Sequence, residues 1–405
     1  MGQRQADTLA FKAKWTWPGP GALESGLWVS LEKGRVKGLV REPEPGVPRL
    51  DLGEGILLPG LVNAHCHLEL SFMAGMIPPQ GDFVGWMESL VNLRPNHGPE
   101  AILEAAYEAA CFMAQNGVAL VGDITNTGRV QEIFRQAGLS QVSFFEALGS
   151  TKAEPPRPDL SWNGNLVSAQ AVAAHSPYSV PASRLRRLKS KAGSTPFAIH
   201  LAESEAETQY LSGNGPLGER MDAFLLQRGV IREDLEIKSP TPLTHVLSLG
   251  LLDKNTLLVH GVQLNREEIK NLASTGASLC VCPRSNLGLT GSMALVPALL
   301  EAGVNLALGT DSLSSTPDLC LWSEMKSLMQ YYPGLKPESV LTMATLGGAR
   351  ALGLADHFGS LAPGKVGEMA FVPLSKGLAR DEVLKALVWG EHEGPPQAVG
   401  GKLPV

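Results

Sequence analysis

Two histidines on alternate residues are the feature of this sequence that most directly indicates chemistry. His65 and His67 lie in the apolar run LPGLVNAHCHLELS. Because side chains alternate between the two faces of a β-strand, both imidazoles point the same way and Cys66 points to the other face. Two imidazole nitrogens on one face can bind a metal ion. An isolated pair of this kind is more often a coincidence or part of a hydrogen-bonded core, so the interpretation depends on partners elsewhere in the chain.

Three further polar residues stand at the ends of short apolar runs. His200 closes TPFAIH, His260 closes NTLLVH and Asp311 follows VNLALGT. Such runs are typical of buried parallel strands, whose carboxyl ends form the face of a barrel on which active sites are built. Neutral imidazoles and a carboxylate suit zinc or ferrous iron, and three or four protein ligands with one position left for water are typical of a catalytic site. The sequence therefore predicts a catalytic metal centre.

The elements that must position these residues alternate between strand-like and helix-like segments. Apolar runs predict strands at residues 61–67, 119–125, 142–148, 167–175, 197–203, 256–262, 278–283 and 304–311. Helical patterns occur at 99–117, 204–211, 265–276 and 296–303, and several of them end in glycine, as helices often do. Eight alternating units favour a parallel sheet closed into a (β/α)8 barrel, a fold of the α/β class.

The two ends of the chain have a different pattern. Residues 1–58 contain Pro and Gly clusters around the alternating run GLWVSLEKGRVKGLV, which predicts antiparallel strands, and the tail 358–405 is similar. We therefore expect a barrel domain over residues 59–357 and one small composite β-sandwich domain formed by both chain ends.

Composition is that of a soluble enzyme. The chain has 405 residues, 44% of them hydrophobic, and a formal net charge of -6, which gives no basic surface for a nucleic acid. Because we find neither a bilayer-length apolar run nor a leader-type apolar core, we expect a cytoplasmic protein without a membrane partner. Five cysteines in apolar contexts predict reduced thiols, and Cys280 and Cys282 are expected to pack in the core rather than bind metal.

Motifs spread along nearly the whole chain resemble the amidohydrolase superfamily, in its branch of metal-dependent deaminases and chlorohydrolases. They are GILLPGLVNAHCHLE, AHSPYS, HLAES, LVHGVQL, CPRSNLGLTG, LGTDSLSS and GSLAPGKVGEMAFV. The resemblance implies one divalent metal ion, with zinc expected and ferrous iron as the alternative, bound by His65, His67, His200 and Asp311. It also implies that Glu203 and His260 serve the chemistry and that Asp311, besides binding the metal, takes a proton from water.

Three residues are predicted to contact the substrate. His175 ends the fourth strand and resembles a family position that faces the substrate, while Arg284 and Asn286 follow the seventh strand. A guanidinium there can bind a substrate carboxylate in bidentate fashion, although an ion pair with a structural acid is the commoner use of such an arginine. The chain departs from the family pattern at Gln263, where many relatives have His, and at Glu368, where Asp is usual.

The leading hypothesis is a hydrolytic deaminase of an aminated purine nucleoside-like substrate, releasing ammonia. The motifs HLELS, CPRSN and DSLSS most resemble aminodeoxyfutalosine deaminases of the alternative menaquinone route, and that substrate would bring a carboxylate to Arg284. The alternatives are a chlorohydrolase or other hydrolytic displacement on an azine ring, and a deaminase of S-adenosylhomocysteine, methylthioadenosine, guanine or cytosine. A non-catalytic scaffold is the least favoured, because every proposed ligand is present. The expected partner is a small heterocyclic molecule, and a homodimer is one compatible assembly.

Overall fold

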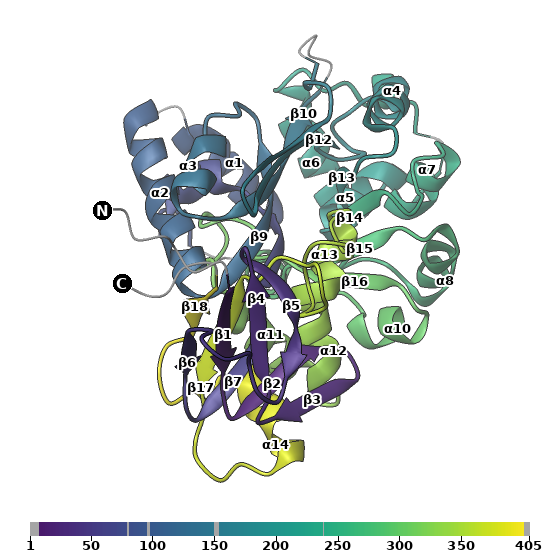
Figure 1. The fold of residues 1–405 in the computed structure, drawn as a ribbon. Coiled ribbons are helices and arrows are strands. Elements are labelled where there is room, and N and C mark those ends of the chain that lie inside the picture. The colour runs from purple at the N-terminus through teal and green to yellow at the C-terminus, as the bar shows by residue number, and fades with distance from the viewer. Residues whose placement is uncertain (1–7, 79–80, 95–97, 150–153, 238, 401–405) are drawn as a thin grey trace.

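A run of parallel strands, each hydrogen-bonded to the next, forms the centre of the molecule (Figure 1). The computed structural model describes residues 8–78, 81–94, 98–149, 154–237 and 239–400. In that part of the chain the run holds eight strands: β8 (Leu61–Cys66), β9 (Val118–Thr125), β10 (Ser140–Ala147), β12 (Leu166–Ala174), β13 (Phe197–Leu201), β14 (Thr256–His260), β15 (Ser278–Val281) and β16 (Asn305–Leu308). They coincide with the eight predicted strands, so the expected (β/α)8 architecture is confirmed.

The first and last strands of the run meet at their carboxyl ends. Cys66 and Asp311 form a parallel bridge, and the backbone carbonyl of His65 accepts a hydrogen bond from the N–H of Thr310 at 3.0 Å. The Asn63 amide donates to the Thr310 hydroxyl at 2.8 Å. The sheet therefore closes into a barrel at the residues that the sequence marks as metal ligands.

Alternate residues of the strands pack into two separate apolar clusters. One cluster, on the inner face of the barrel, holds Ala64, Leu120, Val142, Phe144, Ala171, Ala173, Ala198, Leu257, Val259 and Ala307. The other packs the opposite strand face against the helices, and includes Phe197, Ile199, Leu258, Leu279, Leu185 and Leu188. Cys280 and Cys282 belong to the inner cluster and Cys66 to the outer one. This confirms that the two neighbouring cysteines are core residues and that Cys66 faces away from the site.

Helices connect successive strands and cover the outer face of the barrel (Figure 1). They are α2 (Pro99–Gln115), α3 (Gln131–Gln136), α4 (Ala182–Ala192), α5 (Glu205–Ser212), α6 (Pro216–Leu226), α7 (Pro242–Ser248), α8 (Arg266–Thr275), α9 (Pro283–Thr290) and α10 (Val296–Glu301). After the last strand come α11 (Leu321–Tyr331), α12 (Pro337–Thr342) and α13 (Gly348–Ala351), and Ala349 and Ala351 of α13 belong to the inner cluster. The 3-10 helix η1 (Leu68–Met73) and α1 (Phe83–Leu93) follow β8. Among the described helices we find none with the length and apolar character needed to cross a membrane.

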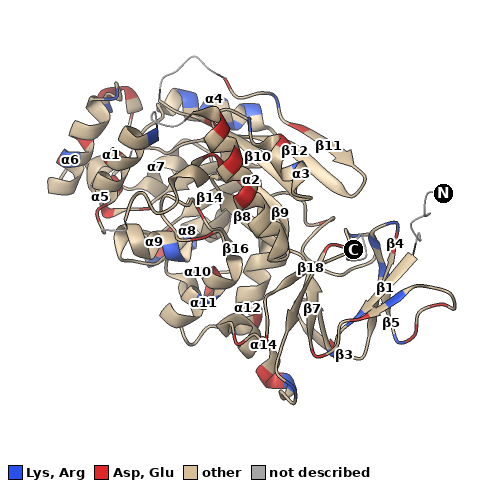
Figure 2. Ribbon diagram, turned by 90° about the vertical axis from the view of Figure 1, so that its left-hand side faces the viewer, with Lys and Arg blue, Asp and Glu red and all other residues tan. Residues whose placement is uncertain are grey.

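Two further sheets lie beside the barrel (Figure 2). One has the order β5-β4-β1-β6 and comes from the N-terminal region: β1 (Thr8–Lys12), β4 (Trp28–Glu32), β5 (Arg35–Val40) and β6 (Arg49–Asp51). The other has the order β18-β17-β7-β2-β3 and joins both chain ends: β2 (Trp15–Gly19), β3 (Ala22–Ser25), β7 (Gly55–Pro59), β17 (Met369–Pro373) and β18 (Gln397–Val399). Both chain ends therefore contribute to one sheet, as the sequence predicts, but β1 pairs with β6, and β2 with β7, in parallel rather than in the expected antiparallel direction.

Two elements differ from the expected pattern. The C-terminal tail contains a helix between its two strands, α14 (Arg380–Trp389), because Val383, Ala386 and Leu387 recur at helical spacing and are buried. A short strand, β11 (Asp159–Asn163), pairs antiparallel with β12 on the way into the barrel. Its residues are mostly exposed, so it carries no apolar run by which the sequence could indicate it.

Candidate active site

Three imidazoles from two strand ends converge at the carboxyl end of the barrel. His65 and His67 come from the end of β8, and His200 comes from β13. Nε2 of His67 lies 3.3 Å from Nε2 of His200, and the ring centroids of His65 and His67 are 4.8 Å apart. One ligand atom from each of the three residues lies within 4.8 Å of the others. This geometry is that of a metal-binding histidine cluster.

Asp311 completes the cluster from the end of β16. Its Oδ1 lies 3.6 Å from Nε2 of both His65 and His67. Its Oδ2 accepts hydrogen bonds from the hydroxyls of Ser285, at 2.6 Å, and Ser315, at 3.0 Å. The two serines therefore fix the carboxylate so that one oxygen faces the histidines. The structure brings together all four residues predicted to bind the metal.

The donor atoms of this cluster fit a divalent cation. Nδ1 of His200 donates to the backbone carbonyl of His175 at 2.7 Å, so the lone pair on Nε2 faces His67. Within the described residues, the buried Nε2 of His65 has no hydrogen-bond partner. Burial, with the neighbouring histidines, lowers the pKa of His67 well below its usual range and that of His200 to about 4. Neutral imidazoles whose ring nitrogens lie this close together are stabilised when those nitrogens bind one shared cation.

Unusual backbone conformations are concentrated at these strand ends. His260, Asp311 and Ala202 have left-handed φ angles of 80°, 59° and 52°, a conformation that residues other than glycine seldom adopt. Val259 packs on the inner face, so simple alternation would turn His260 outward. Instead its ring lies 5.5 Å from that of His200. The left-handed turn thus brings His260 into the site.

Glu203 lies beside His260 and Asp311, where it can exchange protons. Its Oε1 is 3.5 Å from Nε2 of His260, and the ligand atoms of the three residues lie within 4.8 Å of one another. Burial raises the pKa of Glu203 well above its usual range, and the nearby carboxylates of Asp311 and Glu207 add to this effect. A carboxyl group whose pKa is raised by its surroundings can act as a general acid.

Asn286 is placed behind His260 rather than in open space near a substrate. Its side-chain amide nitrogen lies 3.0 Å from Nδ1 of His260, and Asn286 is fully buried. Donation to Nδ1 leaves the proton of the neutral ring on Nε2, the nitrogen nearest Glu203. Asn286 therefore positions His260, a different contact from the predicted one with a substrate.

His175 stands at the edge of the site with one ring nitrogen engaged. Its Nδ1 is within hydrogen-bond distance of the hydroxyls of Ser179, at 2.7 Å, and Ser176, at 3.0 Å. The ring is half-buried, and its centroid lies 5.4 Å from that of His200. This position is compatible with the predicted substrate contact through Nε2, which remains a prediction.

The guanidinium of Arg284 is engaged by two acidic residues. Its Nε donates to the buried carboxylate of Glu324 at 2.7 Å, and one terminal nitrogen donates to Asp318 Oδ1 at 2.6 Å. The backbone N–H of Arg284 also donates to Glu324, at 2.9 Å. The structure thus favours the ion pair with structural acids over the predicted contact with a substrate carboxylate, because the donors needed for a bidentate contact are already in use.

Sequence reasoning missed two acidic residues next to the site. Glu146, at the end of β10, follows Val142 and Phe144 of the inner cluster at a spacing of two, so the period of that strand was a usable signal. Glu207, in the first turn of α5, accepts hydrogen bonds from the backbone of Ala202 and Glu203. The contacts of Glu207 depend on the conformation of the turn after β13, which no pattern in the sequence predicts.

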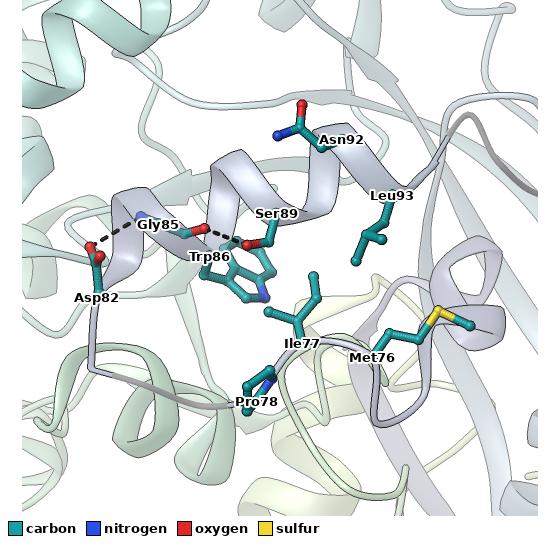
Figure 3. A pocket seen from close by; sticks show the side chains of 9 residues that line it. All are labelled: Met76, Ile77, Pro78, Asp82, Gly85, Trp86, Ser89, Asn92 and Leu93. Atoms are coloured by element: carbon teal, nitrogen blue, oxygen red, sulfur yellow. Dashed lines mark hydrogen bonds between the residues drawn. The ribbon is translucent and has the colours of Figure 1, made fainter.

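A cavity of about 290 Å³ lies between α1 and the segment that follows η1 (Figure 3). Met76, Ile77, Trp86 and Leu93 are among the side chains that line it. The indole N–H of Trp86 donates to the backbone carbonyl of Ser314 at 3.0 Å. Since Ser314 follows Asp311 closely in the chain, this bond ties the wall of the cavity to the loop that carries a metal ligand.

A parallel barrel with three histidines and an aspartate gathered at its carboxyl end defines the class of metal-dependent barrel hydrolases. Residues 56–392 match the amidohydrolase family, and the chain belongs to that family.

Relatives in that family have been named as deaminases. The aminodeoxyfutalosine deaminase of a Nitratiruptor species is 30% identical over 81% of this chain and 82% of its own length. The 5-methylthioadenosine/S-adenosylhomocysteine deaminase of Syntrophobacter fumaroxidans is 29% identical over 81% of this chain and 74% of its own length.

Solved structures share the fold at lower identity. Helicobacter pylori aminofutalosine deaminase in complex with methylthio-coformycin has a TM-score of 0.79 and 22% identity, covering 94% of this chain and 96% of that one. Atrazine chlorohydrolase from Arthrobacter aurescens, complexed with zinc, has a TM-score of 0.77 and 16% identity, covering 94% and 91%. Both the deaminase and the chlorohydrolase therefore use this architecture.

Proposed function

We propose that this protein is a metal-dependent hydrolytic deaminase that replaces the amino group of a purine nucleoside-like substrate with an oxygen and releases ammonia. The observation that carries the proposal is the position of the buried Glu203, beside His260 and Asp311, next to the cluster of His65, His67, His200 and Asp311. A general acid beside a metal centre suits attack on an electron-poor ring carbon, because negative charge then collects on the ring nitrogen. The names of its relatives favour an adenine-type ring.

The cluster of four ligands would hold a single divalent ion, for which we propose zinc. Two solved structures of similar fold contain bound zinc, an adenosine deaminase from Xanthomonas campestris and the Arthrobacter chlorohydrolase. When bound, such an ion supplies Lewis acidity, which makes a water molecule acidic near neutral pH. The nitrogen and oxygen donors also suit ferrous iron, so metal analysis of the purified protein is required.

The residues of the chain account for the proton transfers. In the proposed sequence, Asp311 accepts one proton from water as the water oxygen bonds to the carbon that bears the amino group. Glu203 donates its proton to the adjacent ring nitrogen, which takes the electron pair of the C=N bond. Asp311 then protonates the departing amino group, and the remaining hydroxyl proton returns to Glu203 as the C=O bond forms. His260, held by Asn286, presents Nε2 beside Glu203 and can donate to the developing oxygen charge.

For the substrate we propose a 6-aminopurine nucleoside, with aminodeoxyfutalosine and methylthioadenosine as the first molecules to test. The two deaminase relatives support this choice. Arg284 gives no support for aminodeoxyfutalosine in particular, because its guanidinium is engaged by Glu324 and Asp318 instead of being available to a substrate carboxylate. The assignment to a menaquinone route therefore depends on the likeness of sequence alone.

An ammonia-release screen tests the proposal. The metal-loaded protein is incubated with adenosine, methylthioadenosine, S-adenosylhomocysteine, aminodeoxyfutalosine, guanine and cytosine, and with a chlorinated triazine followed by chloride release. We expect ammonia from the purine nucleosides, and we expect Glu203→Gln to abolish most of it. Chloride release without ammonia from any purine would overturn the proposal in favour of a chlorohydrolase, and metal-loaded protein inactive on every compound would favour a non-catalytic scaffold.

A further inference from the structure

Glu146 places a second carboxyl group on the inner face of the barrel, away from the proton-transfer residues. It continues the row of inward residues Val142 and Phe144 on β10, and its side chain is 5% exposed. One of its oxygens lies within 4.8 Å of ring nitrogens of both His175 and His200. Glu203 and Asp311 form a separate group with His260. Acidic groups therefore lie at two different places around the site.

Among the described residues, only one oxygen of the Glu146 carboxylate has a hydrogen-bond donor. Its Oε2 accepts from the amide of Asn126 at 2.9 Å. Its Oε1 is buried and has no hydrogen-bond partner among the described residues. The nearest ring nitrogen, Nδ1 of His200, is 3.7 Å away and already donates to the carbonyl of His175. A buried carboxylate oxygen without a donor is costly, so it marks a place where a donor from outside the chain is expected.

A second metal ion is a poor candidate for this place. Because Nδ1 of His200 carries a proton, it has no lone pair to offer on this side. Nδ1 of His175 is taken by Ser176 and Ser179. The carboxylate of Glu146 and the remaining nitrogen of His175 are too few ligands for a stable cation site. An organic donor such as a hydroxyl group fits better, since it needs only one or two acceptors.

The position of Glu146 indicates which part of a substrate would meet it. In a purine nucleoside the amino-bearing carbon and the sugar lie at opposite ends of the ring system. The reacting end must approach Glu203 and Asp311. The other end then extends away from those residues, toward the ends of β10 and β12, where Glu146 and the half-buried His175 lie.

We infer that Glu146 is a specificity-determining residue that accepts a hydrogen bond from a sugar hydroxyl of the nucleoside. This inference rests on the proposed function. Asn126 holds the other carboxylate oxygen and so fixes the direction of the free one. A nucleoside that lacks the hydroxyl leaves Oε1 without a donor, and the enzyme discriminates against it for that reason.

The test compares substrates that differ by one hydroxyl. Values of kcat/KM are measured for adenosine, 2′-deoxyadenosine and 3′-deoxyadenosine with the wild type, Glu146→Ala, Glu146→Gln and the control Glu132→Gln, whose carboxylate is exposed and paired with Arg135. We expect the wild type to prefer adenosine over one of the deoxy analogues by roughly 10- to 100-fold, the range for a hydrogen bond to a charged group. In Glu146→Ala we expect that ratio to fall to about 1 through loss on adenosine alone.

Other results would overturn the role proposed for Glu146. Nucleoside deamination in which Glu146→Ala lowers all three substrates equally would overturn the inference and leave the proposed function intact. Activity confined to substrates without a sugar would overturn both. A metal content below that of the wild type in Glu146→Ala would mean that Glu146 supports His200 instead, which also overturns it. If Glu146→Ala fails to fold, the isosteric Glu146→Gln still tests the inference. We expect its ratio of kcat/KM for adenosine to that for the deoxy analogue to lie between the wild-type ratio and about 1.

Discussion

The carboxylate of Glu207 holds the backbone of Glu203. One of its oxygens accepts from the N–H of Glu203 at 2.8 Å, and the other accepts from the N–H of Ala202 at 3.0 Å. Ala202 is the residue whose left-handed φ of 52° turns the chain out of β13. Glu207 is itself fully buried at the start of α5. A second acidic side chain therefore fixes the turn from which the proposed general acid reaches the site.

Replacing Glu207 tests whether this turn sets the position of Glu203. Glutamine has one acceptor oxygen, so Glu207→Gln loses one of the two bonds and places an NH₂ group against a backbone N–H. We expect kcat to fall by roughly 10- to 100-fold, with metal content and KM nearly unchanged, because effects of misplaced catalytic groups are of this size. The exposed Glu219→Gln is the control. A fall in metal content would show that the turn serves the ligands instead.

The titration of Glu207 gives stability a pH dependence of known sign. Burial raises the pKa of Glu207 from 4.5 to about 7. The folded state therefore keeps a proton that the unfolded chain releases, so the stability contributed by this group is present below its unfolded pKa and is lost as the pH rises through about 7. In urea unfolding we expect the free energy of the wild type minus that of Glu207→Gln to decrease between about pH 5 and about pH 8. A difference that rises with pH would contradict the assignment.

Glu203→Gln should separate the chemistry from binding. The substitution keeps the shape of the side chain but removes the proton that Glu203 is placed to donate. We expect turnover to fall by roughly 100-fold or more, the usual contribution of a positioned proton donor, while metal content stays at the wild-type value. The neighbouring Glu205→Gln, whose side chain is exposed on α5, should be fully active. Turnover close to normal in Glu203→Gln would leave Glu203 without a role in the reaction.

The metal site should be mononuclear and should depend on ligands at the carboxyl ends of both the first and the last strand of the barrel. Elemental analysis of the purified protein should find about one divalent ion per chain, because the four ligands surround a single point. His65→Ala and Asp311→Ala should each lose most of it, since the remaining ligands bind weakly. His357→Ala, whose ring contacts Trp162 away from the site, should retain the metal. Full activity without metal, or two fully occupied ions, would refute this assignment.

Arg284 should matter for stability rather than for substrate choice. Arg284→Met leaves the fully buried carboxylate of Glu324 without its partner, and breaking a buried ion pair typically costs about 3–5 kcal/mol. In urea unfolding, the double variant Arg284→Met with Glu324→Leu should be more stable than Arg284→Met alone, because the unpaired charge is removed as well. Wild-type stability with a selective loss on a carboxylated substrate would instead restore the predicted substrate contact.

The strands and the metal ligands could be predicted because each depends on local sequence. Residues such as Phe197–Leu201 form a continuous apolar run, which a strand buried on both faces requires, and His200 marks its carboxyl end. His65 and His67 are predicted to share a face because side chains two residues apart on a strand point the same way. Spacing along the chain does not show which polar residues at strand ends lie together in space. The resemblance to family motifs supplied that grouping.

The contacts that the sequence could not reveal depend on distant segments or on local backbone strain. Arg284 meets Glu324 from α11, a pairing that neither neighbourhood indicates. Alternation along β14 would turn His260 outward, and only its left-handed backbone brings the ring inside. Asn286 could be placed near the site from its strand end, but the ring nitrogen it contacts follows from the three-dimensional arrangement of α9 and β14.

The closure of the barrel also sets when the site can exist during synthesis of the chain. Asn63 and Thr310, which join its two edges, are 247 residues apart in sequence, and metal ligands flank this junction on both sides. While a ribosome is still making the barrel, a nascent chain offers His65 and His67 but not the carboxylate of Asp311. Because domains tend to fold as units, metal loading must wait until almost the entire barrel has emerged. Translation products that end before Asp311 therefore lack one of the four proposed ligands.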